Sequence, residues 1–426
     1  MSITILQQPS LALNSSNNDS IFVITGSSGY TSSVEDFKYI ADVYVAGTRV
    51  TTLKTFPDPS YGYGVFNLRN IVPNFVSYDV IYNISQDTGS VFHSASNSST
   101  SVSVYFGREF VYNNGFSQSR GEVSSSNFNY INSALSFIDQ STLSLSNYLV
   151  TSASSSTVNF LTKANFTIPT YANLRNYLYY YLSSSVGTAL NITTYDGNNN
   201  QLGQYYVSNT ITGSYNGVQI VATGYSQLSL LISGSATNNY HVITGNSVMF
   251  NSSVSSYVVQ LTGTGGITFT KPVSYKVNQD CSRFGPYAYA VYWLNTLGGF
   301  DSWLFNKTNT VNSTKTQSQY KKIVGQLNAN GTYGINTYSS AIIPFYTEVN
   351  SSIQLSTDFL TDQQVKYLKG LYDSPVIYLQ DPNGNLISAT IDDSTPYSLN
   401  QKNVNTKAYA LTLTFIPSVP DYRQSL

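Results

Sequence analysis

The residues able to carry out chemistry are few in this chain, and they are far apart in the sequence. There are two histidines, His93 and His241, and a single cysteine, Cys281. A Ser-His-Asp triad would have to use one of the histidines, but each lies in or beside a strand pattern, which favours a structural role. Cys281 would need a nearby histidine to act as a nucleophile. The sequence implies none, so we expect a packing cysteine.

The carboxylates give no clearer sign of catalysis. A glycosidase needs two carboxyl groups at a fixed separation, and no glutamate lies in an aromatic setting that would raise its pKa. Asp392-Asp393 is interpreted as a turn, and an aspartate pair elsewhere is the alternative left open. The sequence therefore predicts no catalytic residue, no metal site, no cofactor and no enzymatic activity. The glutamates are Glu35, Glu109, Glu122 and Glu348.

One glycine-rich stretch, Thr262–Gly266, raises the question of a phosphate site. A phosphate cradle needs a helix N-terminus directly behind the glycines. Here a strand pattern follows, so we interpret the stretch as a β-turn. No Walker, EF-hand or dinucleotide-binding motif is present.

The low charge of the chain excludes several classes of partner. Charged residues make up 10% of the 426 residues, and the net charge is −1. Nucleic-acid binders need clustered lysine and arginine, and the one short cluster, Lys321-Lys322, is interpreted as a solvated face. We therefore expect no nucleic-acid partner. No apolar stretch approaches 18 residues, and Met1–Ser10 lacks a signal-peptide pattern, so neither membrane insertion nor export is predicted.

The polar surface must instead consist mainly of hydroxyl and amide groups. Tyrosine, of which there are 37, is enriched at interfaces because it combines a large rigid ring with a polar tip. The alternative is that these tyrosines only reflect strand preference. Asn-X-Ser/Thr matches, such as those at Asn14 and Asn191, are interpreted as products of composition, with an exported glycoprotein as the alternative.

The periodicity predicts a mainly β protein with three domains. These are an N-terminal β domain over 1–115 with an extended arm, a central Ser/Tyr-rich β domain over 116–268, and a C-terminal α+β domain over 269–426. We expect antiparallel β-sandwiches. Predicted hairpins join 37–45 to 49–56 and 190–195 to 202–207, and 226–232 is expected to be a strand. Residues 128–149 are ambiguous between helix and strand. The segment 171–182 is ambiguous too, because Leu174, Leu178 and Leu182 repeat every fourth residue while its run of tyrosines favours a strand; Pro169 tips the prediction toward a helix.

The clearest local signal is a capped helix in the C-terminal domain. Thr361 is expected at the N-cap, with Gln364 as its capping-box partner. Leu360 and Val365 can form a hydrophobic staple, and Pro375 stops the helix. A strand over 376–380, a turn at 381–384 and a return strand over 386–391 are predicted to follow.

Aromatic residues mark two further candidate sites. Both tryptophans, Trp293 and Trp303, flank a predicted reversal at Gly298-Gly299, where glycine permits a positive φ angle or a close backbone approach. We favour a core hairpin anchored by tryptophan, with a carbohydrate-stacking platform as the alternative. Tyr61–Gly64 is expected to be a flexible aromatic turn, which makes Tyr61 and Tyr63 interface candidates.

Several stretches together resemble a known group of proteins. The stretches are 1–9, 21–23, 37–45, 53–59, 61–66, 293–301 and 360–379. As a set, they are similar to virion structural proteins of tailed bacteriophages. The similarity is to tail, baseplate or neck-associated proteins of phages that infect Bacteroidetes, including crAss-like phages. It covers both ends of the chain, whereas residues 125–265 match nothing comparable.

The resemblance implies a structural component of a virion, in its tail or baseplate. Such a chain would be made in the host cytoplasm and would bind copies of itself and other virion proteins through large interfaces, with Met1–Ser20 as a docking arm. The alternative is a fibre, a capsid-decoration protein or an adhesin that binds host surface glycan. A host surface-layer protein and a β-fold glycan hydrolase are further alternatives.

Overall fold

The structure is a computed structural model of the whole chain, and its described residues form mainly β-structure, as predicted. Their contacts divide the chain into two units, which are described separately below. The first unit contains residues 1–282 and 293–302, and the second contains 283–292 and 303–426. The described residues are 2–26, 34–79, 90–112, 115–152, 154, 157–171, 174–183, 187–209, 211, 216–232, 240–246, 248–263, 266–278, 289–305, 307, 309–380, 385–392, 397, 400–403 and 408–418.

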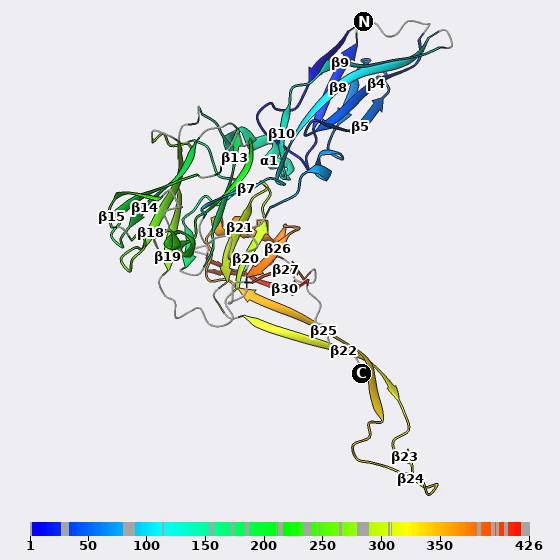
Figure 1. Ribbon diagram of the computed structural model, residues 1–426, viewed down its shortest axis with the longest axis vertical. Coiled ribbons are helices and arrows are strands. Elements are labelled where there is room, and N and C mark those ends of the chain that lie inside the picture. The colour runs from blue at the N-terminus through cyan, green and yellow to red at the C-terminus, as the bar shows by residue number, and fades with distance from the viewer. Residues whose placement is uncertain are drawn as a thin grey trace. The chain divides into compact units, whose positions relative to one another are not determined.

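The first unit begins with a β-sandwich (Figure 1). Its core is closed by Phe22, whose ring centroid lies 5.5 Å from those of Phe106 and Phe128 on the facing sheet. One sheet has the order β1 (Ile3–Gln7), β3 (Ile21–Gly26) and β6 (Gly64–Asn67). The other has the order β2 (Asn14–Ser15), β10 (Phe128–Ile131), β8 (Ser99–Tyr112), β4 (Val34–Val45) and β5 (Thr48–Thr55), and β9 (Gly115–Ser124) also pairs with β8.

This sandwich differs from the predicted domain in two respects. The N-terminal segment is not a free arm, because β1 pairs with β3 and β2 pairs with β10. The sheet also continues past the predicted boundary at residue 115 through β9 and β10. The predicted hairpin of β4 and β5 is confirmed.

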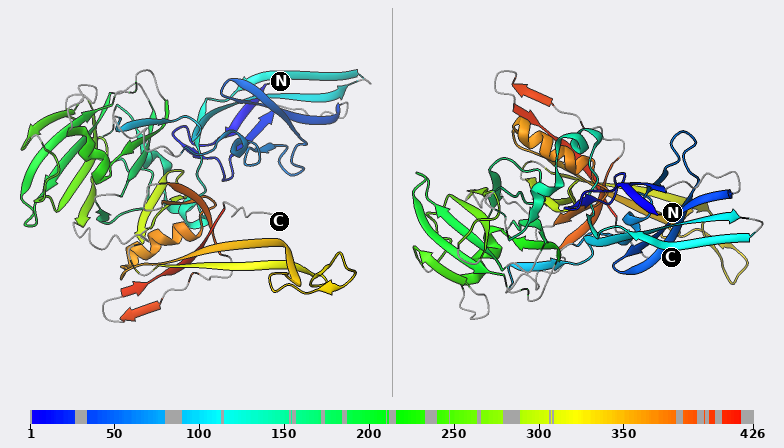
Figure 2. Two further views of the ribbon diagram at one scale, coloured as in Figure 1. Left: turned by 60° about the horizontal axis from the view of Figure 1, so that its bottom comes forward. Right: turned by 90° about the horizontal axis from the view of Figure 1, so that it is seen from above.

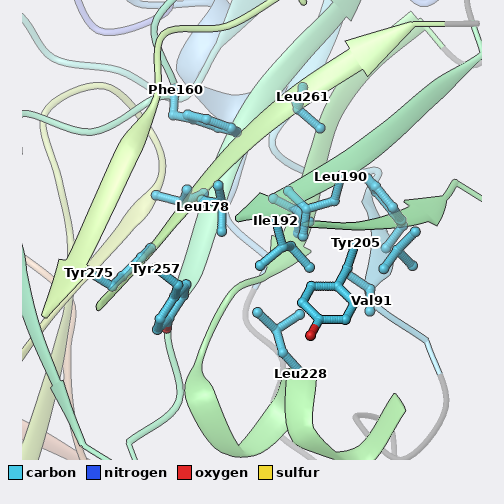
Figure 3. Packing of buried hydrophobic residues seen from close by; sticks show 14 of the residues in the cluster. Val91, Phe160, Leu178, Leu190, Ile192, Tyr205, Leu228, Tyr257, Leu261 and Tyr275 are labelled. Atoms are coloured by element: carbon cyan, nitrogen blue, oxygen red, sulfur yellow. The ribbon is translucent and has the colours of Figure 1, made fainter. Parts of the chain in front are cut away.

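A second sandwich follows in the same unit. Its core contains mainly aliphatic side chains and tyrosines, including Tyr257 and Tyr275, whose stacked rings lie 4.9 Å apart (Figure 3). One sheet has the order β11 (Leu149–Val150), β13 (Tyr177–Ser183), β16 (Asn216–Ala222) and β7 (Phe92–Ala95). The other has the order β12 (Ile168–Tyr171), β19 (Val273–Asn278), β18 (Ser256–Gly263), β14 (Thr188–Tyr195), β15 (Gln201–Ser208) and β17 (Tyr240–Thr244).

Two predictions in this region are wrong. The segment 171–182 is not a helix: residues 177–183 form β13, an interior strand of its sheet. Residues 226–232 are not a strand but lie in α2 (Tyr225–Ser229) and a 3-10 turn at Leu230–Ile232. The side chain of Gln227 accepts hydrogen bonds from the backbone amides of Gly224 and Asn176, which fixes the start of α2.

The ambiguous segment 128–149 has mixed structure. It contains β10, α1 (Phe137–Thr142), a 3-10 turn at Leu145–Tyr148 and the first residue of β11. The hairpin of β14 and β15 around Asp196–Asn200 is confirmed.

The second unit is organised around one sheet and one helix, α3 (Asp362–Tyr372). Trp303 and Tyr367 of α3 lie with their ring centroids 6.4 Å apart. Small pairs outside the sheet are β23 (Gln326–Leu327) with β24 (Tyr333–Gly334), and β28 (Asn400–Asn403) with β29 (Ala408–Ala410). The sheet order is β21 (Phe300–Phe305), β20 (Tyr289–Leu294), β26 (Ile377–Gln380), β27 (Leu386–Ile391), β30 (Thr412–Pro417), β25 (Ile342–Ser356) and β22 (Thr310–Lys321). Residues 293–294 of β20 and 300–302 of β21 are assigned to the first unit.

Candidate interaction surface

The most unusual feature of the second unit is a long β-ribbon, residues 309–352, which we call the arm. Strands β22 and β25 pair from Thr310–Gln354 to Lys321–Ile342. β25 contacts its other neighbour, β30, only through Ile353–Ser356. Beyond that point the arm is two strands wide, and it runs away from its own sheet to the β23–β24 hairpin (Figures 1 and 2).

The arm has no core of its own. None of the residues 309–352 is buried. An isolated two-stranded hairpin is marginally stable at best in water, because it lacks a covered apolar face. The arm therefore needs a further surface if it is to be held in one conformation.

The half of the arm nearest the sheet is polar. The hydroxyl oxygens of Ser313 and Ser351 lie 3.5 Å apart, and the Gln317 amide donates to the hydroxyl of Thr347 over 3.2 Å. Lys315 also lies on the outer strand, where a charged side chain opposes edge-to-edge pairing. This half has the character of a solvated stalk.

The far half of the arm, residues 320–346, exposes many large apolar and aromatic side chains, and we call it the tip. A β-bulge separates the two halves, since Ser318 pairs with Tyr346 and Gln319 with Pro344, which leaves Phe345 unpaired in the ladder. Bulges bend a ribbon and redirect its side chains. The exposed large side chains of the tip are Tyr320, Ile323, Leu327, Tyr333, Ile335, Tyr338, Ile342, Phe345 and Tyr346.

Exposure at the tip is high for such side chains. Ile323 is 80% exposed, Ile335 76% and Tyr338 81%. Since a large aromatic side chain offers about 150–250 Å², the exposed tip residues together present roughly 1,000 Å². One partner in a typical stable interface contributes about 800 Å². The tip alone is thus large enough to be half of an interface.

The end of the tip has a defined shape. The Asn328 amide donates to the carbonyl of Thr332 over 2.8 Å. The side-chain oxygen of Asn330 accepts from the backbone amide and the hydroxyl of Thr332 over 3.1 and 2.6 Å. These bonds hold the β23–β24 turn in one conformation. Less conformational entropy is therefore lost when the turn binds a partner.

The tryptophan hairpin is structural. Trp293 is fully buried and Trp303 nearly so, so neither ring offers a platform for a sugar. Within the first unit, the side chain of Asn295 donates to the carbonyl of Leu161 and accepts from the backbone amides of residues 297 and 299. Gly298 has φ +87°, and a Cβ atom there would lie 2.5 Å from the carbonyl oxygen of Asn132. At Gly299 a Cβ atom would approach the carbonyl oxygen of Leu161 to 2.7 Å.

The aromatic loop at 56–63 is exposed, but its backbone is held by hydrogen bonds rather than loose. The carboxylate of Asp58 accepts from the amides of Ser60 and Tyr61, and its carbonyl accepts from the amide of Gly62. Tyr61 is 75% exposed, and its ring is stacked on that of Tyr63 at 5.9 Å. Both tyrosines remain available for contact.

The capping box of α3 is confirmed. Gln364 donates its backbone amide to the Thr361 hydroxyl over 3.4 Å, and the Thr361 amide donates to the Gln364 side chain over 2.9 Å. Leu360 and Val365, the predicted staple pair, are both buried. These residues define the start of the helix and lie outside the arm.

Two of the carboxylates that the sequence singled out, Glu109 and Glu122, form structural ion pairs in the first sandwich. Glu109 is buried beneath Lys54, whose amine lies 2.7 Å from its carboxylate, and this contact holds the pKa of Glu109 below its ordinary value. Glu122 pairs with Arg108 at 2.9 Å. Glu348 lies on the arm and accepts from the Tyr346 hydroxyl.

The two histidines do not come together. His93 lies in β7 and His241 in β17, on the two different sheets of the second sandwich. Cys281, Asp393, the turn 381–384 and residues 264–265 lie outside the described residues. Among the residues that the structure describes, no group of three or more His, Cys, Asp or Glu side chains could hold a metal ion.

The helices that the structure describes are all too short or too polar to cross a membrane. The chain matches no protein-family model and no curated protein.

Sequence reasoning missed the arm. Residues 306–349 gave no predicted element beyond the Lys321-Lys322 pair, whose lysines are both exposed on the arm. The available signal was a run rich in Ser, Thr, Asn and Gln over 309–319, followed by the apolar group 342–346 beyond glycine-containing turns.

Proposed function

We propose that this chain is a structural component of a bacteriophage virion, in its tail or baseplate, and that it acts through subunit interfaces rather than catalysis. The observation that carries this proposal is the arm, an exposed ribbon with a polar stalk and an apolar tip. A segment of this kind is a liability in a free protein, since exposed apolar surface and open strand edges promote association. In an assembly the same surface is covered by a neighbour.

A second apolar projection in the first unit supports the same role. Helix α1 begins at the N-cap Ser136, whose hydroxyl accepts from the amide of Asp139. Its first two residues, Phe137 and Ile138, are 88% and 71% exposed. Two adjacent large apolar side chains on a capped turn have the form of an interface anchor. A subunit with several neighbours needs more than one such surface.

The virion assignment rests on the resemblance of both ends of the chain to tailed-phage structural proteins, together with a surface that carries little charge. Removing a neutral hydroxyl or amide group from water costs less free energy than removing a charged group. They therefore suit large contact faces between subunits.

The direct test uses washed, gradient-purified particles of the phage whose genome encodes this chain. Quantitative mass spectrometry should find the chain at a fixed stoichiometry to the other structural proteins. Particles made without the gene should lack the tail or part of it. Complete infectious particles that do not contain the chain would refute the proposal.

The second candidate function is a host-glycan-binding protein, and the aromatic loop favours it. Phe56 is 61% exposed, with the amine of Lys38 4.8 Å above its ring, and the stacked Tyr61 and Tyr63 lie in the same loop. Glycan-array binding that is lost in the Tyr61→Ala variant would support this function. An array without binding, together with a chain built into the particle, would favour the structural role.

A further inference from the structure

We propose that the tip of the arm docks onto the body of a second copy of this chain, so that each copy donates one tip and receives another. This inference rests on the proposed function, because it names the partner of the surface described above. The contact joins two different surfaces. Contacts of this heterologous kind build closed rings or filaments instead of two-fold dimers.

The size of the tip is the first argument. Its exposed large side chains offer roughly 1,000 Å², using the area typical of aromatic residues. This matches the share of one partner in a stable protein interface. A tip–body contact that buried most of these side chains would therefore reach the size of a stable interface.

Charge is the second argument, and it points to the body as the receiving surface. The arm contains Lys315, Lys321 and Lys322 but only one acidic residue, Glu348, which gives a net charge of +2. Because the whole chain carries −1, the remainder carries −3. Two tips carry charge of the same sign, whereas the tip and the rest of the chain carry net charges of opposite sign. This favours head-to-tail docking over pairing of two arms.

The polar stalk is the third argument. Strands rise about 3.3 Å per residue, so β22 places the tip roughly 40 Å from the start of the arm. The stalk exposes mainly hydroxyl and amide groups along this length, and Lys315 opposes pairing at its outer edge. The apolar side chains are thereby concentrated at the tip, at the distance where a neighbouring subunit would be contacted.

The test is sedimentation velocity of the full chain over a range of concentrations. The wild type should form a reversible oligomer. The triple variant Ile323→Ser/Ile335→Ser/Tyr338→Ser should have a dissociation constant at least about 100-fold higher, because interface anchors dominate binding. Its circular dichroism and thermal midpoint should stay unchanged, since the three side chains are exposed. Val311→Ser, an exposed apolar substitution in the stalk, is the matched control and should associate like the wild type.

A mixing experiment separates head-to-tail docking from tip-to-tip pairing. The triple variant lacks a working tip but keeps the receiving surface, so labelled wild type should still bind it. A wild type that is monomeric at every concentration, a triple variant that associates normally, or a triple variant that cannot bind wild type would each overturn the inference. A monomeric wild type that is nevertheless present in washed particles would refute this inference and leave the proposed function standing. A chain that self-associates but is missing from washed particles would support this inference and refute the proposed function.

Discussion

Replacing Gly298 with alanine tests how the tryptophan hairpin is held in the first unit. Gly298 adopts φ +87°, which costs an alanine about 1–2 kcal/mol. Its new Cβ atom would also lie 2.5 Å from the carbonyl oxygen of Asn132. Forcing a methyl group into such a contact adds about 1–3 kcal/mol. We therefore expect Gly298→Ala to lower the free energy of unfolding by about 2–5 kcal/mol.

Gly266→Ala is the matched control in the same unit. Gly266 has φ +80°, but nothing lies within 4 Å of the position that its Cβ would take. This variant should therefore lose only the conformational term of about 1–2 kcal/mol. The difference between the two variants isolates the close approach of the backbone at Asn132.

The assay is thermal unfolding followed by tryptophan fluorescence and by calorimetry. Trp293 lies in the same hairpin and is fully buried, so its emission reports on the packing around Gly298. At about 2–4 °C per kcal/mol for a unit of this size, Gly298→Ala should lower the midpoint by about 4–20 °C and Gly266→Ala by about 2–8 °C. Equal losses in the two variants would refute the reasoning.

Three further predictions concern other parts of the chain. Tyr39→Phe removes the hydroxyl that donates to the carbonyl of Gly62 over 3.0 Å; urea denaturation should show a loss of about 1–3 kcal/mol, and an unchanged midpoint would contradict this contact. Thr361→Ala should cost the second unit about 1 kcal/mol through loss of the N-cap, and Thr361→Ser should restore it; equal values for both variants would exclude the cap as the cause. Lys54 lowers the pKa of Glu109, so this carboxylate stabilises the fold above its unfolded pKa of about 4.3 and less as the pH falls through its folded pKa. The stability lost in Glu109→Gln should accordingly be largest near neutral pH and shrink in acid, and a pH-independent difference would count against the ion pair.

The sequence predicted elements whose signals are local. The hairpins around 46–48 and 196–200 have turn residues between strand-forming runs, and α3 has a complete capping box. A local signal also led to the wrong helix prediction over 171–182. Leu174, Leu178 and Leu182 are four residues apart, which resembles the spacing of one face of a helix. The central position of β13 between two other strands outweighs that spacing, and such a partner cannot be found by periodicity.

Pairing between strands far apart in the chain could not be predicted either, because periodicity does not identify a strand's partner. β7 pairs with β16, more than a hundred residues away, across the predicted domain boundary. The arm was missed for a different reason. Strands are recognised by alternation between a buried and an exposed face, and β22 has no buried face. Its sequence therefore reads as a polar loop, although its backbone is paired along its whole length.

The most direct test of the structural role is single-particle imaging of the intact particle at a resolution that traces the arm. Our account predicts copies of the chain in a ring or layer of the tail or baseplate, each with its tip buried against the body of the next copy. Copies with their tips in solvent, or a chain found only as a detachable fibre that binds glycan, would contradict it.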